Sequence, residues 1–374
     1  MKLVVFGLTI TSSWGNGHAT LWRGLVRALI ARGHRVVFFE RDVPYYAGAR
    51  DLWEIPGGEL VLYPSWDAVL PCARSHLADA DVAMVTSYCA DGVAAARAVL
   101  DSPAQLRTFY DLDTPVTLDG VKTGREVPYL PPEGLGGFDL VLSFTGGAAL
   151  EQLRTTLGAR RAAPLYGHVD PDVHRPVPPL EGPRADLSYL GTYAEDRQAA
   201  LEALFIAPAR RMPGRRFLIA GAQYPHDFPW TDNVYFQRHL PPAGHPAFFC
   251  SSRLTLNVTR RAMAEMGFCP SGRLFEAAAC GVPILTDAWD GLGAFFTPGE
   301  EILTASTTDE AISAISLGDE ELRRIAAAAR ERTLAEHTSK RRAMELEEML
   351  DAAVRGEEWG GGEAVAEGSL AMEA

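Results

Sequence analysis

The sequence predicts an α/β protein built from two doubly wound, Rossmann-like domains, and three observations lead to this prediction. Short apolar runs alternate with segments of helical periodicity in both halves of the chain. A proline-rich stretch separates the two halves. The 374 residues, 47% of them hydrophobic, suffice for two domains of about 100–200 residues each. Ligands bind such sheets at the carboxyl ends of their strands, so the domains are expected to face a cleft.

The first half opens with a βαβ unit. The continuous apolar run at 2–8 is typical of a strand buried on both faces of a parallel sheet. Leu21, Leu25 and Leu29 then recur at helical spacing, and a second apolar run follows at 35–40. The later elements continue the alternation, with strands expected at 82–88, 106–113, 138–145, 187–193, 215–221, 253–258 and 283–288, and helices near 91–99, 148–157 and 273–280.

The predicted domain organisation follows from where the composition shifts. Five prolines between 171 and 186 indicate a linker, and the segment after 319 reads as two helices broken near His337. The Gly- and Glu-rich end is expected to be disordered. The resulting prediction is a first Rossmann-like domain at 1–172, a linker at 173–186, a second Rossmann-like domain at 187–335, a C-terminal helix at 336–355 and an acidic tail at 356–374.

Charge and composition exclude several classes of function. The net charge is −13, of which residues 343–374 carry −8, so the rest of the chain is nearly balanced and offers no basic field for nucleic acid. No apolar stretch approaches the roughly 18 residues of a membrane span. The five cysteines form no zinc-type spacing and fit reduced thiols. A cytoplasmic protein without a membrane span is expected.

The segment 267–303 carries the strongest local signal. Pro270, Ser271 and Gly272 form a turn before a short helix, whose free N–H groups favour an anion, and Arg273 adds a positive charge. Glu276 lies one helical turn further on the same face. A phosphate site with a carboxylate one turn away matches a nucleoside diphosphate and its ribose. The alternative is a well-capped helix with an exposed Glu.

This segment resembles the donor-binding signature of group 1 glycosyltransferases, most closely the CgeB-like branch related to a spore maturation protein. The resemblance rests on PSGRLFEAAACG at 270–281, LNVTR at 256–260 and FFTPGEEIL at 295–303. It implies a GT-B fold in which the first domain binds the acceptor and the second binds a nucleotide-sugar. It also implies that the last helix crosses back to the first domain.

The resemblance further implies roles for individual residues. Glu276 would bind the ribose, and Ser271, Gly272 and Arg273 the diphosphate. One departure stands at Phe268, where many retaining relatives carry a Glu that contacts the sugar, so the stereochemistry does not carry over. Further candidates for donor binding are Arg197, Asn257 and Arg260, with Asp290 as a loop candidate.

The loop after the first strand holds a candidate general base, His18. A helix N-terminus disfavours imidazolium, so the ring is expected to stay neutral and able to accept a proton. The arrangement is similar to the Gly-His loop of inverting GT-B enzymes; the alternative is a polar residue that starts a helix. Gly15, Asn16 and Gly17 are loop candidates, and Gly15-x-Gly17 also invites a dinucleotide-binding interpretation. Thr20 replaces the third glycine of that fingerprint, which disfavours a dehydrogenase.

Asp113 follows a strand of the first domain, so it is expected to hold acceptor or sugar hydroxyls, and it is the second candidate base if His18 is not the base. Asp111 and Asp113 superficially resemble a DxD metal motif, but that motif belongs to a fold with one nucleotide-binding domain; the alternative is an Asp that caps the loop before Pro115. Gly146 and Gly147 precede another helix and are loop candidates. The histidines show no metal-type spacing, so no metal ion and no other cofactor is expected.

Together these features predict a metal-independent glycosyltransferase. It would move a sugar from a nucleoside-diphosphate-sugar to a hydroxyl-bearing acceptor, which could be a glycan, a natural product or a protein. Two alternatives remain open on the same fold: a nucleotide-sugar epimerase, and a non-catalytic protein that binds sugar nucleotides or glycans. Phe268 keeps the non-catalytic alternative open.

Overall fold

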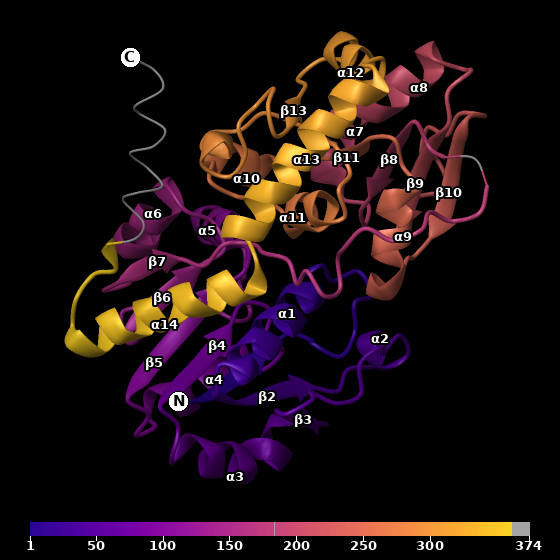
Figure 1. The fold of residues 1–374 in the computed structure, drawn as a ribbon. Coiled ribbons are helices and arrows are strands. Elements are labelled where there is room, and N and C mark those ends of the chain that lie inside the picture. Colours follow the sequence, from indigo (N-terminus) through magenta and orange to yellow (C-terminus); the bar gives the residue numbers. More distant parts are fainter. Residues whose placement is uncertain (183, 361–374) are drawn as a thin grey trace. The chain divides into compact units, whose positions relative to one another are not determined.

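The chain divides into two compact units. The structure, a computed structural model, describes residues 1–182 and 184–360. Unit 1 combines residues 1–166 with the chain from 339 onward, and unit 2 comprises Gly167–Thr338; Figure 1 colours the chain along its length. Residues 167–172, which the sequence analysis places in the first domain, therefore lie in unit 2.

Unit 1 is built on a seven-stranded parallel sheet with the order β3-β2-β1-β4-β5-β6-β7. Leu3 of the central strand β1 pairs with Val36 on one side and Val82 on the other, so the connections reverse direction beside β1. Ligands of doubly wound sheets bind at this kind of switch point. The strands are β1 (Lys2–Gly7), β2 (Arg35–Arg41), β3 (Glu59–Tyr63), β4 (Val82–Thr86), β5 (Leu106–Asp111), β6 (Leu140–Ser143) and β7 (Ala162–Pro164).

The last helix of the chain belongs to unit 1 and packs against its first helix. Leu346 and Leu350 of that last helix are buried, and Glu347 accepts a hydrogen bond of 2.6 Å from Arg32 Nε. The helices of unit 1 are α1 (His18–Ala31), α2 (Pro44–Ala47), α3 (Trp66–Leu77), α4 (Gly92–Leu100), α5 (Thr114–Lys122), α6 (Ala148–Leu157) and α14 (Ser339–Arg355).

Unit 2 contains a six-stranded parallel sheet with the order β10-β9-β8-β11-β12-β13. Its core includes Tyr189, Phe205, Phe217 and Leu256, which are at most 2% exposed. The strands are β8 (Leu187–Leu190), β9 (Phe217–Gly221), β10 (Val234–Arg238), β11 (Thr255–Asn257), β12 (Ile284–Thr286) and β13 (Leu303–Thr304).

Short helices cover the sheet of unit 2, and the longest, α13, packs against α11. The predicted break near His337 is confirmed, because α13 ends at Glu336 and α14 begins at Ser339. The helices are α7 (Gln198–Leu201), α8 (Ala207–Arg211), α9 (His245–Cys250), α10 (Arg261–Met266), α11 (Gly272–Ala279), α12 (Thr308–Ile315) and α13 (Asp319–Glu336), with short helical turns η1 (Glu195–Arg197), η2 (Glu202–Ile206), η3 (Pro242–Gly244) and η4 (Leu292–Ala294).

The predicted fold class is confirmed, whereas several short strands were not foreseen. β3, β7, β10 and β13 have between two and five residues, too few for a clear apolar period. β10 pairs only with β9 and leaves Tyr235 and Phe236 exposed, so its pattern is that of a sheet edge. In the described part of the chain, no helix is long and apolar enough to cross a membrane.

Candidate functional site

The start of α11 in unit 2 has the geometry of an anion site. Ser271 lies just before the helix in extended conformation, and its Oγ accepts a hydrogen bond from Arg273 N at 3.4 Å. The predicted phosphate contact Ser271 thus also caps its own helix. Gly272 is the first helical residue, and no acidic side chain lies in the first turn. The dipole of α11 therefore presents partial positive charge that no protein carboxylate of that turn offsets.

Two arginines meet near this helix start. Burial lowers the pKa of the half-buried Arg273 guanidinium, and the charge of the neighbouring Arg197 lowers it further. In the part of the chain that the structure describes, neither arginine forms an ion pair, and Arg197 Nε is buried without a hydrogen-bond partner. Two like charges held together without a counter-ion favour the binding of an anion. Arg197 was predicted here through its place after β8, at the end of η1.

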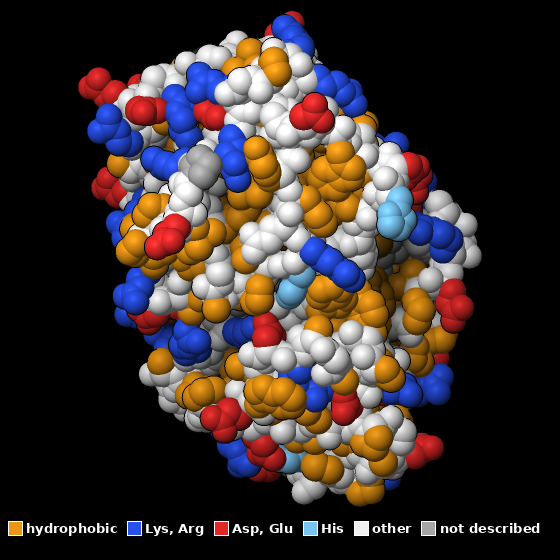
Figure 2. Space-filling view, turned by 90° about the vertical axis from the view of Figure 1, so that its right-hand side faces the viewer, with side chains coloured by type: hydrophobic (Ala, Val, Ile, Leu, Met, Phe, Trp, Pro, Cys, Tyr) orange, Lys and Arg blue, Asp and Glu red, His pale blue; other side chains and the backbone are white. Residues whose placement is uncertain are grey.

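Aromatic side chains border the arginines. The Tyr224 hydroxyl donates to Gly191 O at 3.0 Å; burial raises the pKa of Tyr224, and Arg197 and Arg273 act against that rise. Tyr224 belongs to a cluster with Phe228, Trp230 and Phe236. On the face of the molecule drawn in Figure 2, hydrophobic side chains lie interspersed with Lys and Arg side chains. The sequence analysis missed Tyr224, because a lone Tyr in a loop has no distinctive pattern.

Glu276 lies one turn along α11 and is only 5% exposed, not the exposed Glu of the alternative interpretation. His174 Nε2 lies 3.9 Å from its Oε1 and His245 Nδ1 lies 3.4 Å from its Oε2. Burial alone would raise the pKa of Glu276, but these histidines and Arg273 outweigh burial and lower it to about 2. Glu276 is therefore a carboxylate at neutral pH. The sequence analysis missed both histidines, because they come from distant segments.

The other predicted donor residues have partners within unit 2. Asn257 is buried at the end of β11 and donates through Nδ2 to Thr286 Oγ1 at 3.0 Å, linking two strands. Arg260 Nε pairs with Asp196 at 2.9 Å, next to Arg197 in the chain. Asp290 is exposed, and its backbone carbonyl accepts a hydrogen bond from the Phe268 N–H.

Phe268, at the position of the family's first Glu, has a left-handed backbone with φ of 46°. The preceding Gly267 also has a positive φ, of 74°. A bulky residue in this conformation is uncommon and costs on the order of 1–3 kcal/mol. The loop before α11 is thus held in a strained conformation, which is typical of functional sites.

In unit 1, the two predicted base candidates lie side by side. His18 Nε2 is 3.7 Å from Asp113 Oδ2, and the ring packs edge-on against Phe144. The second ring nitrogen, Nδ1, is buried without a hydrogen-bond partner among the described residues. His18 begins α1 and Asp113 precedes α5, so both follow the carboxyl ends of central strands, β1 and β5. The sequence analysis treated them as rivals, whereas the structure makes them a pair.

Residues around Asp113 hold it in place. The Tyr88 hydroxyl donates to Asp113 Oδ2 at 2.8 Å, although the Tyr88 backbone has a left-handed φ of 62°. Asp111 Oδ1 accepts bonds from Asp113 N and Thr117 Oγ1. Burial raises the pKa of Asp111 to about 6. Tyr88 was not foreseen, and its strained backbone becomes visible only in the structure.

The loop candidates have structural roles of their own. Asn16 is buried, donates to Thr9 O at 3.0 Å and accepts from the His18 N–H at 3.1 Å, so it fixes the start of α1. Gly15 has a φ of 61°, which favours glycine, whereas a side chain at Gly17 would meet open space.

The second pair of loop glycines is also explained by local structure. A Cβ at Gly146 would lie 2.0 Å from the Tyr166 hydroxyl, so packing demands glycine there. Gly147, just before α6, has a φ of 54°.

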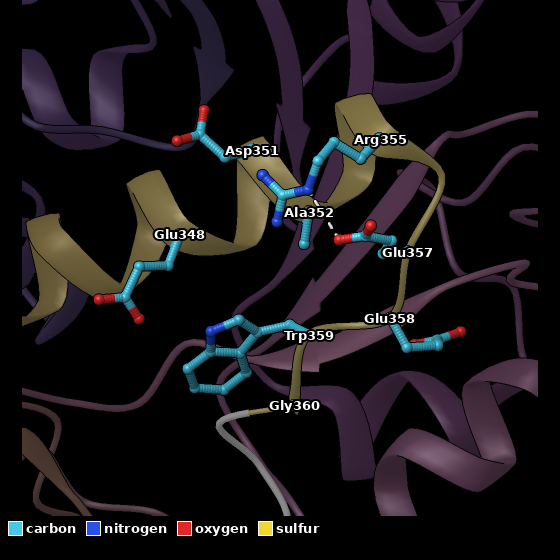
Figure 3. A pocket seen from close by; sticks show the side chains of 8 residues that line it. All are labelled: Glu348, Asp351, Ala352, Arg355, Glu357, Glu358, Trp359 and Gly360. Atoms are coloured by element: carbon cyan, nitrogen blue, oxygen red, sulfur yellow. Dashed lines mark hydrogen bonds and ion pairs between the residues drawn. The ribbon is translucent and has the colours of Figure 1, made fainter.

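A surface pocket of about 470 Å³ lies near the end of α14 and contains none of the predicted site residues. Figure 3 shows that acidic side chains, among them Glu348 and Asp351, line it together with Arg355 and Trp359. The first residues of the predicted disordered tail, 356–360, are placed here, and Gly356 O accepts a bond of 2.8 Å from Arg161. The remainder of that tail, 361–374, lies outside the described residues.

Part of the chain matches a known protein-family model. Residues 197–348 match the family model described as glycosyl transferase-like. No curated protein matches the chain in sequence.

Solved structures cover nearly the whole chain. Sucrose-phosphate synthase from Thermosynechococcus elongatus is 15% identical with a TM-score of 0.69, over 95% of this chain and 100% of that one. The Anabaena protein HepE in complex with UDP-glucose is 12% identical with a TM-score of 0.65, over 94% and 100%. An alpha-glucosyltransferase in complex with UDP-glucose and DNA is 11% identical with a TM-score of 0.69, over 94% and 99%. The chain therefore has the GT-B fold of these glycosyltransferases, and its residues 197–348 are glycosyl transferase-like.

Proposed function

We propose that the protein is a glycosyltransferase that moves a sugar from a nucleoside-diphosphate-sugar, of the UDP-sugar class, to a hydroxyl-bearing acceptor. The observation that carries the proposal is the pair Arg197 and Arg273, held together near the start of α11 without a carboxylate partner among the described residues. A diphosphate supplies the missing negative charge. The UDP complexes of HepE and of the alpha-glucosyltransferase support UDP as the first nucleotide to test.

Each part of the donor has a counterpart in unit 2. The diphosphate is the leaving group and gains charge in the transition state, where Arg273, Arg197 and the α11 dipole stabilise it. These fixed positive groups supply the charge that a divalent metal would otherwise supply, so the proposed reaction needs no metal at the diphosphate. The Glu276 carboxylate, one turn away, accepts hydrogen bonds from the ribose hydroxyls.

Unit 1 supplies the base for the acceptor. In the proposed step, His18 takes the proton of the acceptor hydroxyl while that oxygen attacks the anomeric carbon and the bond to the diphosphate breaks. Asp113 stabilises the imidazolium that forms, and Tyr88 keeps Asp113 in position.

The finer assignments are part of the same proposal. The PSGRLFEAAACG run supports placement in the CgeB-like branch, with a glycan, a natural product or a protein as acceptor. The scattered cysteines support a cytoplasmic location.

The proposal is tested by measuring the melting temperature with UDP, GDP and ADP, followed by an assay for sugar transfer or slow donor hydrolysis. UDP at 100 times its dissociation constant should stabilise the protein by about 2.7 kcal/mol. No shift with any nucleoside diphosphate would refute the donor site.

A second candidate, a non-catalytic sugar-nucleotide binder, is favoured by Phe268, which replaces the Glu that would touch the sugar. Binding of the donor without any turnover would support this candidate. Recovery of an isomerised nucleotide-sugar would instead indicate an epimerase.

A further inference from the structure

Three potential metal ligands converge around Glu276. His174 comes from a turn in the proline-rich linker, His245 starts α9, and Glu276 lies in α11, all within unit 2. One ligand atom from each lies within 4.8 Å of the other two. Among the described residues, this is the one cluster of His, Cys, Asp or Glu side chains with such geometry. The sequence analysis missed this cluster because its three residues lie far apart in the sequence.

The histidine nitrogens in this cluster have no conventional hydrogen-bond partner. The His174 side chain is fully buried, and neither of its ring nitrogens has a partner among the described residues. His245 Nδ1 is also buried and unpartnered. A buried polar atom without a partner costs about 1–3 kcal/mol, and native proteins keep few of them. Two of these atoms, His174 Nε2 and His245 Nδ1, face the same carboxylate, which is the arrangement of ligands around a bound cation.

The tautomer of His245 strengthens this argument. His245 Nε2 lies 3.2 Å from Leu240 O, and a carbonyl can only accept, so Nε2 carries the hydrogen. In the neutral ring, Nδ1 then presents a lone pair to the negatively charged Glu276. A proton or a metal ion must therefore lie between Nδ1 and the carboxylate, and the convergence of three ligand atoms favours the metal ion. A backbone carbonyl that binds the other nitrogen is also the usual support of a metal-ligating histidine.

The distances fit one ion with three ligands. Zinc lies about 2.0–2.2 Å from nitrogen and oxygen ligands, so two ligands in a tetrahedral shell are about 3.4 Å apart. The observed separations are 3.4 Å from His245 Nδ1 to Glu276 Oε2 and 3.9 Å from His174 Nε2 to Glu276 Oε1, so an ion here would contact both carboxylate oxygens or draw the ligands slightly closer. Two imidazoles and a carboxylate suit zinc and its neighbours rather than magnesium, which prefers oxygen ligands.

We propose that His174, His245 and Glu276 form a binding site for a divalent transition-metal ion of the zinc class, with a fourth position open to water. The ion neutralises the carboxylate and binds two of the three buried ring nitrogens, one from each histidine. It ties the linker turn to α9 and α11, so it braces the helix that carries Arg273. This proposal revises the expectation of a chain without any metal site.

The test is a cobalt titration of the full chain after treatment with EDTA and removal of the chelator. Co²⁺ should bind with one ion per chain and give the intense visible bands of a four- or five-coordinate site, and equimolar Zn²⁺ should abolish them. His245→Asn and His174→Asn should each weaken binding at least tenfold. His226→Asn, which removes an exposed histidine of the same unit, is the matched control and should bind as the wild type.

Two outcomes would overturn the proposal. One is a spectrum of six-coordinate aqueous cobalt, and the other is unchanged affinity in a folded His245→Asn variant. Because His174 is fully buried, its variant could fail to fold; His245→Asn, whose residue is partly exposed, then decides alone.

Because Glu276 serves both proposals, the test uses residues that belong to only one of them. Arg273→Gln should lose UDP binding but keep the cobalt spectrum, whereas His245→Asn should lose the spectrum. Failure of UDP binding with an intact cobalt site would refute the transferase proposal and leave the metal site standing.

Discussion

The two candidate sites are built in opposite ways. In unit 2, charged groups lie close together on and around one short helix, and Arg197 and Arg273 form no ion pair with a carboxylate among the described residues. In unit 1, His18 and Asp113 come from two separate loops and are positioned by buried neighbours such as Tyr88. The difference suggests a division of labour, in which unit 2 holds a charged ligand and unit 1 handles a proton.

The largest effect is expected from His18→Ala, which tests the proton half of this division. Turnover should fall by about 10²–10⁴-fold, the usual contribution of a positioned base. Affinity for UDP, measured by calorimetry, should stay unchanged because the nucleotide residues lie in unit 2.

The control is His76→Ala, which removes a histidine of unit 1 that pairs with Glu59 outside the candidate site. Equal losses of turnover and UDP affinity in His18→Ala would mean that the ring contacts the donor, and the division of labour would be wrong.

Asp111→Asn tests how the buried carboxyl group of Asp111 affects the stability of unit 1. Burial raises the pKa of Asp111 from an ordinary value near 3.9 to about 6, so the folded state holds a proton that the unfolded state has already lost. The contribution of Asp111 to the free energy of unfolding is therefore fully present below about pH 4 and is lost as the pH rises to about 6.

The cost of ionising Asp111 corresponds to about 3 kcal/mol. Denaturant unfolding should show Asp111→Asn gaining up to that amount over the wild type at pH 8, with little difference at pH 4. A variant that is less stable than the wild type at pH 8 would show that the ionised carboxylate stabilises the site through its hydrogen bonds.

Arg273→Gln tests the other part of this division of labour, the proposed binding of a charged ligand by unit 2. Loss of a charge-assisted contact costs about 1.5–3 kcal/mol, so UDP should bind about 10- to 100-fold more weakly. The melting temperature without ligand should not fall, because the substitution removes repulsion from Arg197.

Arg211→Gln, on an exposed ion pair with Asp309, is the matched control and should leave UDP binding intact. A drop in the ligand-free melting temperature of Arg273→Gln alone would indicate that the arginine pair stabilises the fold rather than a ligand.

The smallest effect is expected from added Mg²⁺ or Mn²⁺. The rate in EDTA-treated samples should be the same with and without these ions, because Arg197, Arg273 and the α11 dipole already supply positive charge. Activity that depends on Mn²⁺ to the same extent in the wild type and in His245→Asn would assign the diphosphate role to Asp111 and Asp113, and the proposed division of labour between the units would then be wrong.

How much the sequence predicts depends on whether a feature is local. The helix start at Ser271 and the break at His337 follow from neighbouring residues, and the structure reproduces both. The pairing of His18 with Asp113 and of His245 with Glu276 depends on which strands become neighbours, which no linear pattern encodes.

The burial of Glu276 and the backbone strain at Tyr88 and Phe268 could not be predicted from the sequence either. Glu276 was open to interpretation as an exposed residue, and only packing against two histidines explains why it is buried. The positive φ values of Tyr88 and Phe268 contradict their intrinsic preferences, because the surrounding fold overrides them.

The return of α14 to unit 1 makes unit 2 an insertion within the sequence of unit 1. During synthesis, the strands of unit 1 leave the ribosome first, yet the surface of α1 that α14 covers stays open until Ser339–Arg355 has emerged. Unit 2 is continuous in sequence and can close its own core earlier. A segment that follows unit 2 in the sequence therefore completes the packing of unit 1, and truncation within α14 should expose apolar surface in unit 1 while leaving unit 2 folded.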